Sequence, residues 1–221
     1  MNLPTQQQCL DYFEKYVVPR NIFQHCLKVQ EVSLFLAAEL NKKGHTLNIE
    51  QVRVLSLLHD LFKAAALKEL KPSKYHSYQA TPAEIEAWKE LRAKYQGMYE
   101  GEIAFEVFKD SYPGLAVSLK RTSDPQVKDR TPEEELVHYC DWRVLRNIII
   151  PFEDRVAYIE EVYHCIAERV EEIAGMKQFE KEIFVSLGYQ PNDLGDKMEE
   201  LLDQPSPQNV KNSKAEGVEI K

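Results

Sequence analysis

The sequence predicts an all-α fold, and three observations support this class. Helix-capping residues stand at intervals before segments whose apolar residues recur with helical periodicity. Glycines follow several of these segments, where helices are expected to end. No stretch shows the sustained apolar and polar alternation of a half-buried strand. We therefore expect a compact multi-helix bundle with a C-terminal helical extension and a disordered tail.

Four helix starts are marked by a capping side chain with Glu or Gln three residues later. The pairs are Thr5 with Gln8, Asn48 with Gln51, Thr81 with Glu84, and Thr131 with Glu134. Pro82 and Pro132 follow two of the caps, at the first helical position, where the missing N–H carries no penalty. Gly44, Gly175 and Gly188 stand where C-terminal caps are expected.

Extending these signals along the chain predicts ten helices. They are expected over residues 5–17, 21–43, 49–69, 82–96, 99–110, 114–121, 132–148, 152–174, 177–187 and 193–202. The polar connections 71–80 and 122–131 are candidate walls of a site.

The length of 221 residues suits one compact domain with appendages. We expect a main helical domain over residues 1–175 and a helical extension packed on it over 176–203. Residues 204–221 contain two prolines and few large apolar side chains, which is typical of a disordered tail.

Composition narrows the classes of partner. The formal net charge of -8 argues against broad nucleic-acid binding, which needs clustered Lys and Arg. No apolar run reaches the roughly 20 residues of a membrane helix, and no secretory signal is visible at the N-terminus, so we expect a cytoplasmic protein without membrane contact. Cys9, Cys26, Cys140 and Cys165 are widely spaced and are interpreted as small buried apolar residues.

Polar residues interrupt the apolar stripes of three predicted helices. His25 continues the stripe of Val29 and Val32 at helical spacing. His59 lies within the stripe of the third predicted helix, and the adjacent Asp60 stands at its edge. Asp141 occupies the corresponding place in the helix predicted for 132–148. Three helices thus direct imidazole or carboxylate groups inward.

A single buried histidine is usually an ordinary core residue, but buried carboxylates need compensation. A cation provides it for Asp60 and Asp141. Two imidazoles and two carboxylates suit a divalent ion such as Mn²⁺, Fe²⁺, Co²⁺ or Mg²⁺ better than a thiolate-rich zinc site. An ion with open coordination positions would activate a bound water and polarise a phosphoryl oxygen. The site therefore predicts hydrolysis of a phosphate ester.

The order His25, His59–Asp60, Asp141 resembles the H…HD…D signature of the HD superfamily of metal-dependent phosphohydrolases. PRNIFQHCLKVQEV, LSLLHDLFK and EELVHYCDWRV resemble the family's motif segments, and the likeness covers roughly residues 18–165. It implies that the four residues are metal ligands. Lys63 matches the lysine of the HDxxK motif and would contact substrate phosphate, although a surface lysine lying along apolar neighbours is an alternative. Asp60 and Lys63 are the expected catalytic residues.

Other candidates are weaker. Arg20 and Arg143 are candidate substrate-binding residues, with solvent exposure or an ion pair as the alternative. Glu100 and Thr122 stand where dinuclear members carry further histidines, which favours a single metal. Glu100 remains a candidate water-mediated ligand or general base, and His76 a candidate acid or base from its polar loop.

The expected activity is hydrolysis of a phosphate ester in a small phosphorylated metabolite, with nucleotides as the favoured class. One alternative is a phosphodiesterase for cyclic or dinucleotide substrates. Another is a non-catalytic module that senses nucleotides or packs against a partner, and an RNA-processing role is conceivable by analogy of fold alone. The sequence does not indicate the oligomeric state.

Overall fold

The structure, a computed structural model, describes residues 1–67, 69, 70, 72, 77–164 and 166–202. The described residues are predominantly helical, so the all-α prediction is confirmed. The elements are α1 (Gln6–Lys15), α2 (Arg20–Lys42), α3 (Ile49–Leu58), α4 (Lys63–Ala66), α5 (Pro82–Lys94), α6 (Glu100–Phe108), α7 (Pro113–Ser123), α8 (Pro132–Arg143), β1 (Val144–Leu145), β2 (Ile148–Ile149), α9 (Phe152–Tyr163), η1 (Ile166–Glu168), α10 (Val170–Leu187), η2 (Pro191–Asp193) and α11 (Leu194–Leu202).

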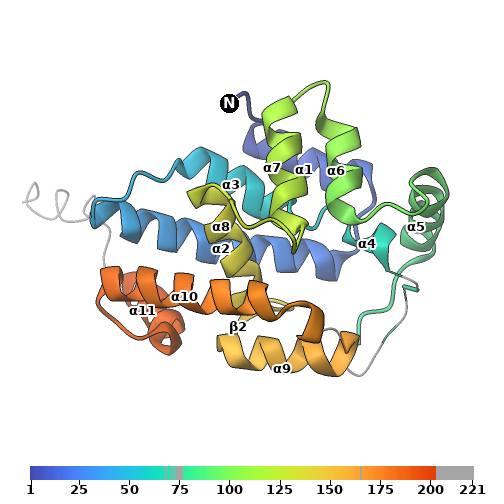
Figure 1. Cartoon of the computed structure of the whole chain (residues 1–221). Coiled ribbons are helices and arrows are strands. Elements are labelled where there is room, and N and C mark those ends of the chain that lie inside the picture. The colour runs from blue at the N-terminus through green and yellow to red at the C-terminus, as the bar shows by residue number, and fades with distance from the viewer. Residues whose placement is uncertain (68, 71, 73–76, 165, 203–221) are drawn as a thin grey trace, which may run out of the picture.

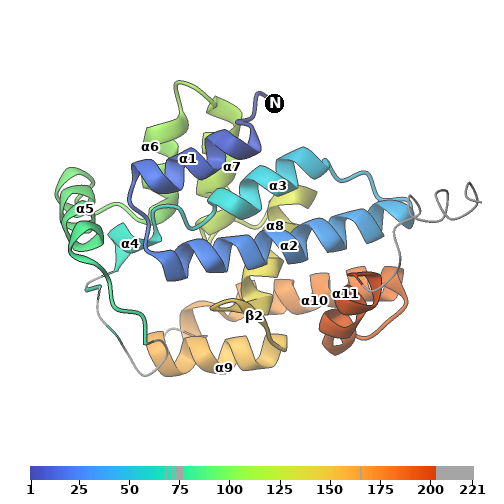
Figure 2. The ribbon, with the colours of Figure 1, turned by 180° about the vertical axis from the view of Figure 1, so that it is seen from behind.

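Helix α2 runs through the middle of the molecule and organises the core (Figure 1). It packs against α3, α8 and α10. Seen from either side, α1, α3, α6 and α7 lie on one side of α2 and α9, α10 and α11 on the other (Figures 1 and 2). Its predicted stripe, including Val29, Val32 and Leu36, is fully buried, and each such side chain contributes about 1.5–3 kcal/mol of burial free energy.

All four predicted helix starts are confirmed. The side chains of Thr5, Asn48, Thr81 and Thr131 each accept a hydrogen bond from the backbone N–H three residues on. Gly44 and Gly188 have φ values of 98° and 83° just past α2 and α10, as expected of residues that end helices in the left-handed region.

The helix predicted for 49–69 is wrong in two respects, because it breaks at the His59–Asp60 pair and because the helical segment after the break, α4, ends at Ala66. Residues 59–62 form turns, and Leu61 and Lys63 donate to carbonyls three residues back. The His59 Nδ1 atom hydrogen-bonds the Ser56 carbonyl at 2.7 Å. A continuing α-helix would give that carbonyl to the N–H of Asp60, so the side chain displaces the backbone from its partner.

The helix predicted for 132–148 ends at Arg143. The next residues form a short antiparallel hairpin in which Val144 pairs with Ile149 and Leu145 with Ile148. Branched apolar residues at 144 and 148–150 favour extended backbone, a preference that helical periodicity does not register. Arg146, in the turn, has a φ of 61°. Two-residue turns of this kind usually have glycine at a position with positive φ.

The helix predicted for 152–174 is divided in two. α9 ends at Tyr163, and His164 caps it in the left-handed conformation. α10 begins at Val170 and continues through Gly175, which is therefore not a helix end. Glycine disfavours a helix interior only weakly, and burial of Met176 and Ile183 on the core face of α10 outweighs this effect.

The expected division at residue 175 thus falls inside α10, and α10 itself packs against α2 and α8. The tail predicted for 204–221 lies outside the described residues. Within the described part of the chain, no helix combines the length and hydropathy needed to cross a bilayer. Cys9, Cys26 and Cys140 are buried, and burial raises the pKa of each thiol, so these three are small core residues as expected. Cys165 is not among the described residues.

Candidate metal centre

The two predicted histidines meet in the core with their rings held by backbone carbonyls. His25 projects from α2, and its Nδ1 lies 2.9 Å from the Arg146 carbonyl in the β1–β2 turn. His59 follows α3, and its Nδ1 lies 2.7 Å from the Ser56 carbonyl. A carbonyl only accepts, so Nδ1 is the protonated nitrogen of each ring. The Nε2 atoms are therefore the ones available to a ligand, as in histidines that bind metals.

Two carboxylates complete the group. His25 Nε2 lies 2.9 Å from Asp141 Oδ1 and 3.9 Å from Asp60 Oδ2. His59 Nε2 lies 3.6 Å from the same Asp141 oxygen and 3.8 Å from the same Asp60 oxygen. One ligand atom from each of the four residues lies within 4.8 Å of the others. We call His25, His59, Asp60 and Asp141 the four-residue cluster.

These separations fit a metal ion. Ligands about 2.0–2.2 Å from a common ion stand roughly 3.0–3.6 Å apart when adjacent and about 4.3 Å when opposite. The four imidazole–carboxylate distances, 2.9–3.9 Å, lie close to this range, and all the ligand atoms lie within 4.8 Å of one another, so a bound ion would have to draw them slightly together. Within the described residues, this is the one group of His, Cys, Asp and Glu side chains with such a geometry, and it could hold a metal ion.

The charges around His59 favour a cation independently of the distances. Its Nε2 is buried and has no hydrogen-bond partner among the described residues. Burial alone lowers the pKa of His59, but the charges of Asp60 and Asp141 outweigh burial and raise that pKa to about 9. The negative charge of the two carboxylates therefore favours a proton on His59, and it would favour a divalent cation at the same place.

Lys63 lies beside the cluster, as its position in the sequence predicted. Its Nζ is 2.8 Å from Glu100 Oε1 and 3.8 Å from Asp60 Oδ1. Burial works against the charged form of Lys63, but the carboxylates of Asp60 and Glu100 raise its pKa. Its side chain is 35% exposed, so it borders the open side of the site. Glu100, the first residue of α6, contacts the cluster through Lys63 and is not in the four-residue cluster.

The structure also places Arg155 of α9 at the cluster, and sequence reasoning missed it. Its Nη2 lies 3.6 Å from Asp141 Oδ1. Burial would raise the pKa of Asp141, but the two imidazoles and the Arg155 charge hold it well below its usual range. Arg155 carried no signal in the sequence, because an arginine near the start of an amphipathic helix usually lies in solvent.

The remaining predicted residues lie elsewhere. Arg20 is exposed at the start of α2, about 140° around the helix from His25, and its backbone N–H lies near Tyr78 and Glu84. Thr122 is buried and donates to the Ser118 carbonyl within α7. His76 lies outside the described residues.

Arg143 is not brought to the cluster but is 1% exposed inside the protein. Its guanidinium donates to the carbonyls of Ile150 and Pro191, to the Tyr139 hydroxyl at 2.6 Å and to Glu180 at 3.0 Å. This network ties α8 to α10 and η2. Arg143 therefore forms a buried ion pair, which was the alternative to substrate binding. None of its hydrogen bonds within the described residues goes to the four-residue cluster.

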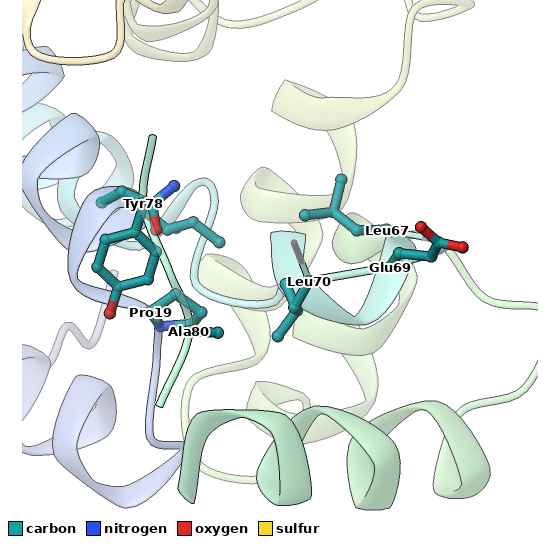
Figure 3. A pocket seen from close by; sticks show the side chains of 8 residues that line it. Pro19, Leu67, Glu69, Leu70, Tyr78 and Ala80 are labelled. Carbon is teal, nitrogen blue, oxygen red and sulfur yellow. The ribbon is translucent and has the colours of Figure 1, made fainter. Parts of the chain in front are cut away.

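A small cavity opens one helical turn from His25. Pro19, Tyr78 and Ala80 line one side and Leu67, Glu69 and Leu70 the other (Figure 3). Its volume of about 30 Å³ suits one or two water molecules rather than a metabolite. A larger hollow, of about 440 Å³, lies along α10 and η2, between Lys177 and Pro191. Neither cavity is lined by the four-residue cluster.

The chemistry available at the cluster is that of a mixed nitrogen and oxygen site with cationic neighbours. Its donor set suits divalent ions that accept imidazole and carboxylate together. Lys63 and Arg155 add positive charge on the Asp60 and Asp141 sides, where an anionic substrate would be attracted. Comparison with protein-family models, curated proteins and solved structures finds no match for this chain.

Proposed function

We propose that this chain is a metal-dependent phosphohydrolase of the HD superfamily, acting on a small phosphorylated metabolite such as a nucleotide. The observation that carries the proposal is the convergence of two Nδ1-anchored imidazoles and two carboxylates beside Lys63. These are the residues to which the sequence resemblance assigns the metal and substrate phosphate. The fit of their separations to an ion supports the same interpretation.

The four-residue cluster would hold a divalent ion, which supplies a lowered pKa for water and polarises a phosphoryl oxygen. The two oxygens of Asp60 have different roles in this proposal. Oδ2 faces the imidazoles and would hold the ion, whereas Oδ1 faces Lys63 and would accept the proton of the attacking water. The Lys63 ammonium offsets negative charge that develops on the phosphoryl oxygens.

Glu100 has a positioning role in the proposed reaction. Its contact with Lys63 directs the ammonium toward the Asp60 side of the cluster. At the start of α6 its own negative charge is favourably placed against the helix dipole. Glu100 thus holds Lys63 extended beside the site rather than in solvent.

The test is to measure bound metal in the purified chain and hydrolysis with Mn²⁺, Co²⁺ and Mg²⁺. The substrates are nucleoside mono-, di- and triphosphates and a generic diester, bis(p-nitrophenyl) phosphate. We expect His59→Ala and Asp60→Ala to lose bound metal and at least about 100-fold in rate, because even partners that only support a ligand cost 10- to 100-fold. His45→Ala and Asp110→Ala make the same changes at exposed positions and should retain wild-type values.

Results of three kinds would contradict the proposal in different ways. Absence of bound metal from the wild-type chain, or a full hydrolytic rate in both cluster variants, would exclude metal-dependent hydrolysis. Metal binding without cleavage of any substrate would favour the sensing module instead. A rate on the diester far above the rates on the nucleotides would favour the phosphodiesterase.

A further inference from the structure

Arg155 is the basic side chain at the cluster whose contacts are least complete. Its side chain is 16% exposed, and its Nε is buried without a hydrogen-bond partner among the described residues. The guanidinium carbon lies 5.3 Å from the centroid of the Tyr158 ring, over which it makes a cation–π contact. Its contact with Asp141, at 3.6 Å, is longer than a hydrogen bond. A buried guanidinium N–H without an acceptor is unfavourable, so this position suits an acceptor supplied by a ligand.

The position of Arg155 is also unfavourable for metal binding taken alone. A positive charge 3.6 Å from a ligand oxygen repels an ion held by that oxygen. Asp141 already has His25 Nε2 at 2.9 Å and His59 Nε2 at 3.6 Å, so Arg155 is not its only neighbour at the cluster. The guanidinium therefore weakens the metal site unless an anion lies between the two positive centres.

Lys63 and Arg155 differ in how far they are already paired. Lys63, near Asp60, has Glu100 at 2.8 Å as a second carboxylate. Arg155, near Asp141, has no second carboxylate among the ion pairs of the described residues. The Asp141 side chain is 27% exposed, so this part of the cluster is reached from solvent. Of the two cations, Arg155 is thus the one with an N–H group free to bind a ligand, and it lies beside the solvent-exposed Asp141.

We infer that Arg155 binds the terminal phosphoryl group of the substrate, and the inorganic phosphate released from it, through its guanidinium fork. The inference rests on the proposed function. A guanidinium binds two oxygens of one phosphoryl group in a bidentate manner, which an ammonium does not reproduce. A terminal phosphoryl group could present two oxygens to Arg155 and would leave a third for the side of the cluster where Lys63 lies. A diester has only two non-bridging oxygens, so the geometry favours substrates with a terminal phosphate.

The experiment uses the full chain and two titrations by calorimetry, Mn²⁺ into each protein and then inorganic phosphate into the Mn²⁺-loaded protein. In Arg155→Gln we expect Mn²⁺ to bind several-fold more tightly, because a repulsive charge is gone. We expect phosphate to bind about 10- to 100-fold more weakly, the range of a lost charge-assisted hydrogen bond. Arg155→Lys should keep wild-type Mn²⁺ affinity and lose about tenfold in phosphate affinity, because it keeps the charge without the fork.

Arg53→Gln is the matched control. Arg53 is similarly shielded, at 21% exposure, and its partners are Glu50 and Gln6 rather than the cluster. Both of its affinities should equal those of the wild type. A purely structural role of Arg155 would weaken Mn²⁺ and phosphate binding together, so the opposite signs expected in Arg155→Gln separate the two roles.

Failure of this inference can be distinguished from failure of the proposed function. If the wild-type chain binds no metal, the proposed function and the role of Arg155 both fall. If the wild type binds Mn²⁺ and hydrolyses phosphate esters but Arg155→Gln keeps its phosphate affinity, only the role of Arg155 falls. If Arg155→Gln lowers kcat/KM equally for a nucleoside monophosphate and for bis(p-nitrophenyl) phosphate, the preference for a terminal phosphate is overturned.

Discussion

Each imidazole of the cluster uses one nitrogen to fix its orientation and presents the other to the two carboxylates. For His59 the consequence is a pKa of about 9, because the charges of Asp60 and Asp141 outweigh burial. Below that pH the Nε2 atom carries a proton, and an ion can bind there only after the proton leaves. Proton and metal thus compete for the same atom.

Metal affinity should therefore rise with pH up to about 9. Between pH 6.5 and 8.5 we expect the Kd for Mn²⁺ to fall about tenfold per pH unit, with release of one proton per ion. Calorimetry in two buffers of different ionisation enthalpy measures both quantities. An affinity that does not change over this range would show that the ion displaces no proton from the cluster, contrary to the raised pKa of His59.

Some residues of the site are predictable from sequence, and others leave no trace in it. His25, His59 and Asp141 break apolar stripes, so periodicity finds them. The carbonyl of Arg146, which anchors His25, belongs to the backbone and has no residue-type signal. Arg155 reads as an ordinary solvated residue, because its approach to Asp141 depends on how α9 folds back after the hairpin.

At the level of elements, the four capped helix starts were predictable, but the start of α10 and several helix ends were not. A capping side chain bonds a backbone N–H within three residues of itself, so the local sequence is enough to determine where such a helix starts. The break after α3 depends on the His59 side chain competing for the Ser56 carbonyl, while the stripe continues unchanged through the break. The end of α8 depends on a hairpin in which Val144 pairs with Ile149, and its positive-φ turn residue is Arg146 rather than glycine, so the usual hairpin signal is missing from the sequence.

The buried Arg143 network should matter for the stability of the C-terminal elements rather than for the site. In Arg143→Met we expect a loss of about 3–5 kcal/mol in the free energy of unfolding, because Glu180 loses its charged partner, keeping only the Tyr139 hydroxyl, and two carbonyls lose their side-chain donor. Urea unfolding measures it. Lys177→Met, which removes an exposed lysine 4.0 Å from Glu153, should cost less than about 1 kcal/mol.

The Mn²⁺ affinity of Arg143→Met distinguishes this role from substrate or metal binding. No guanidinium contact of Arg143 reaches the four-residue cluster, so the folded variant should bind Mn²⁺ within about threefold of the wild type. Wild-type stability combined with weakened phosphate binding would instead return Arg143 to the substrate-binding residues.

For the whole molecule, the cluster joins segments that are distant in the sequence. His25 and Asp141 are 116 residues apart, and α2 and α8, which carry them, pack through the centre of the bundle. The Nδ1 contact of His25 adds the β1–β2 hairpin to the same point. An ion bound there would connect α2, the turn after α3 and α8, so its ligands come together only where that packing is in place.

Metal should therefore stabilise the folded chain as a ligand that binds only the native state. At a free Mn²⁺ concentration about 100 times its Kd, the expected gain is about 2.7 kcal/mol. For a chain of this size that corresponds to a rise in Tm of about 5–10 °C, measurable by calorimetry and reversed by EDTA. His59→Ala should lose the shift, and His45→Ala, which removes an exposed imidazole, should retain it. An equal rise in His59→Ala would mean that Mn²⁺ stabilises the protein through a different site.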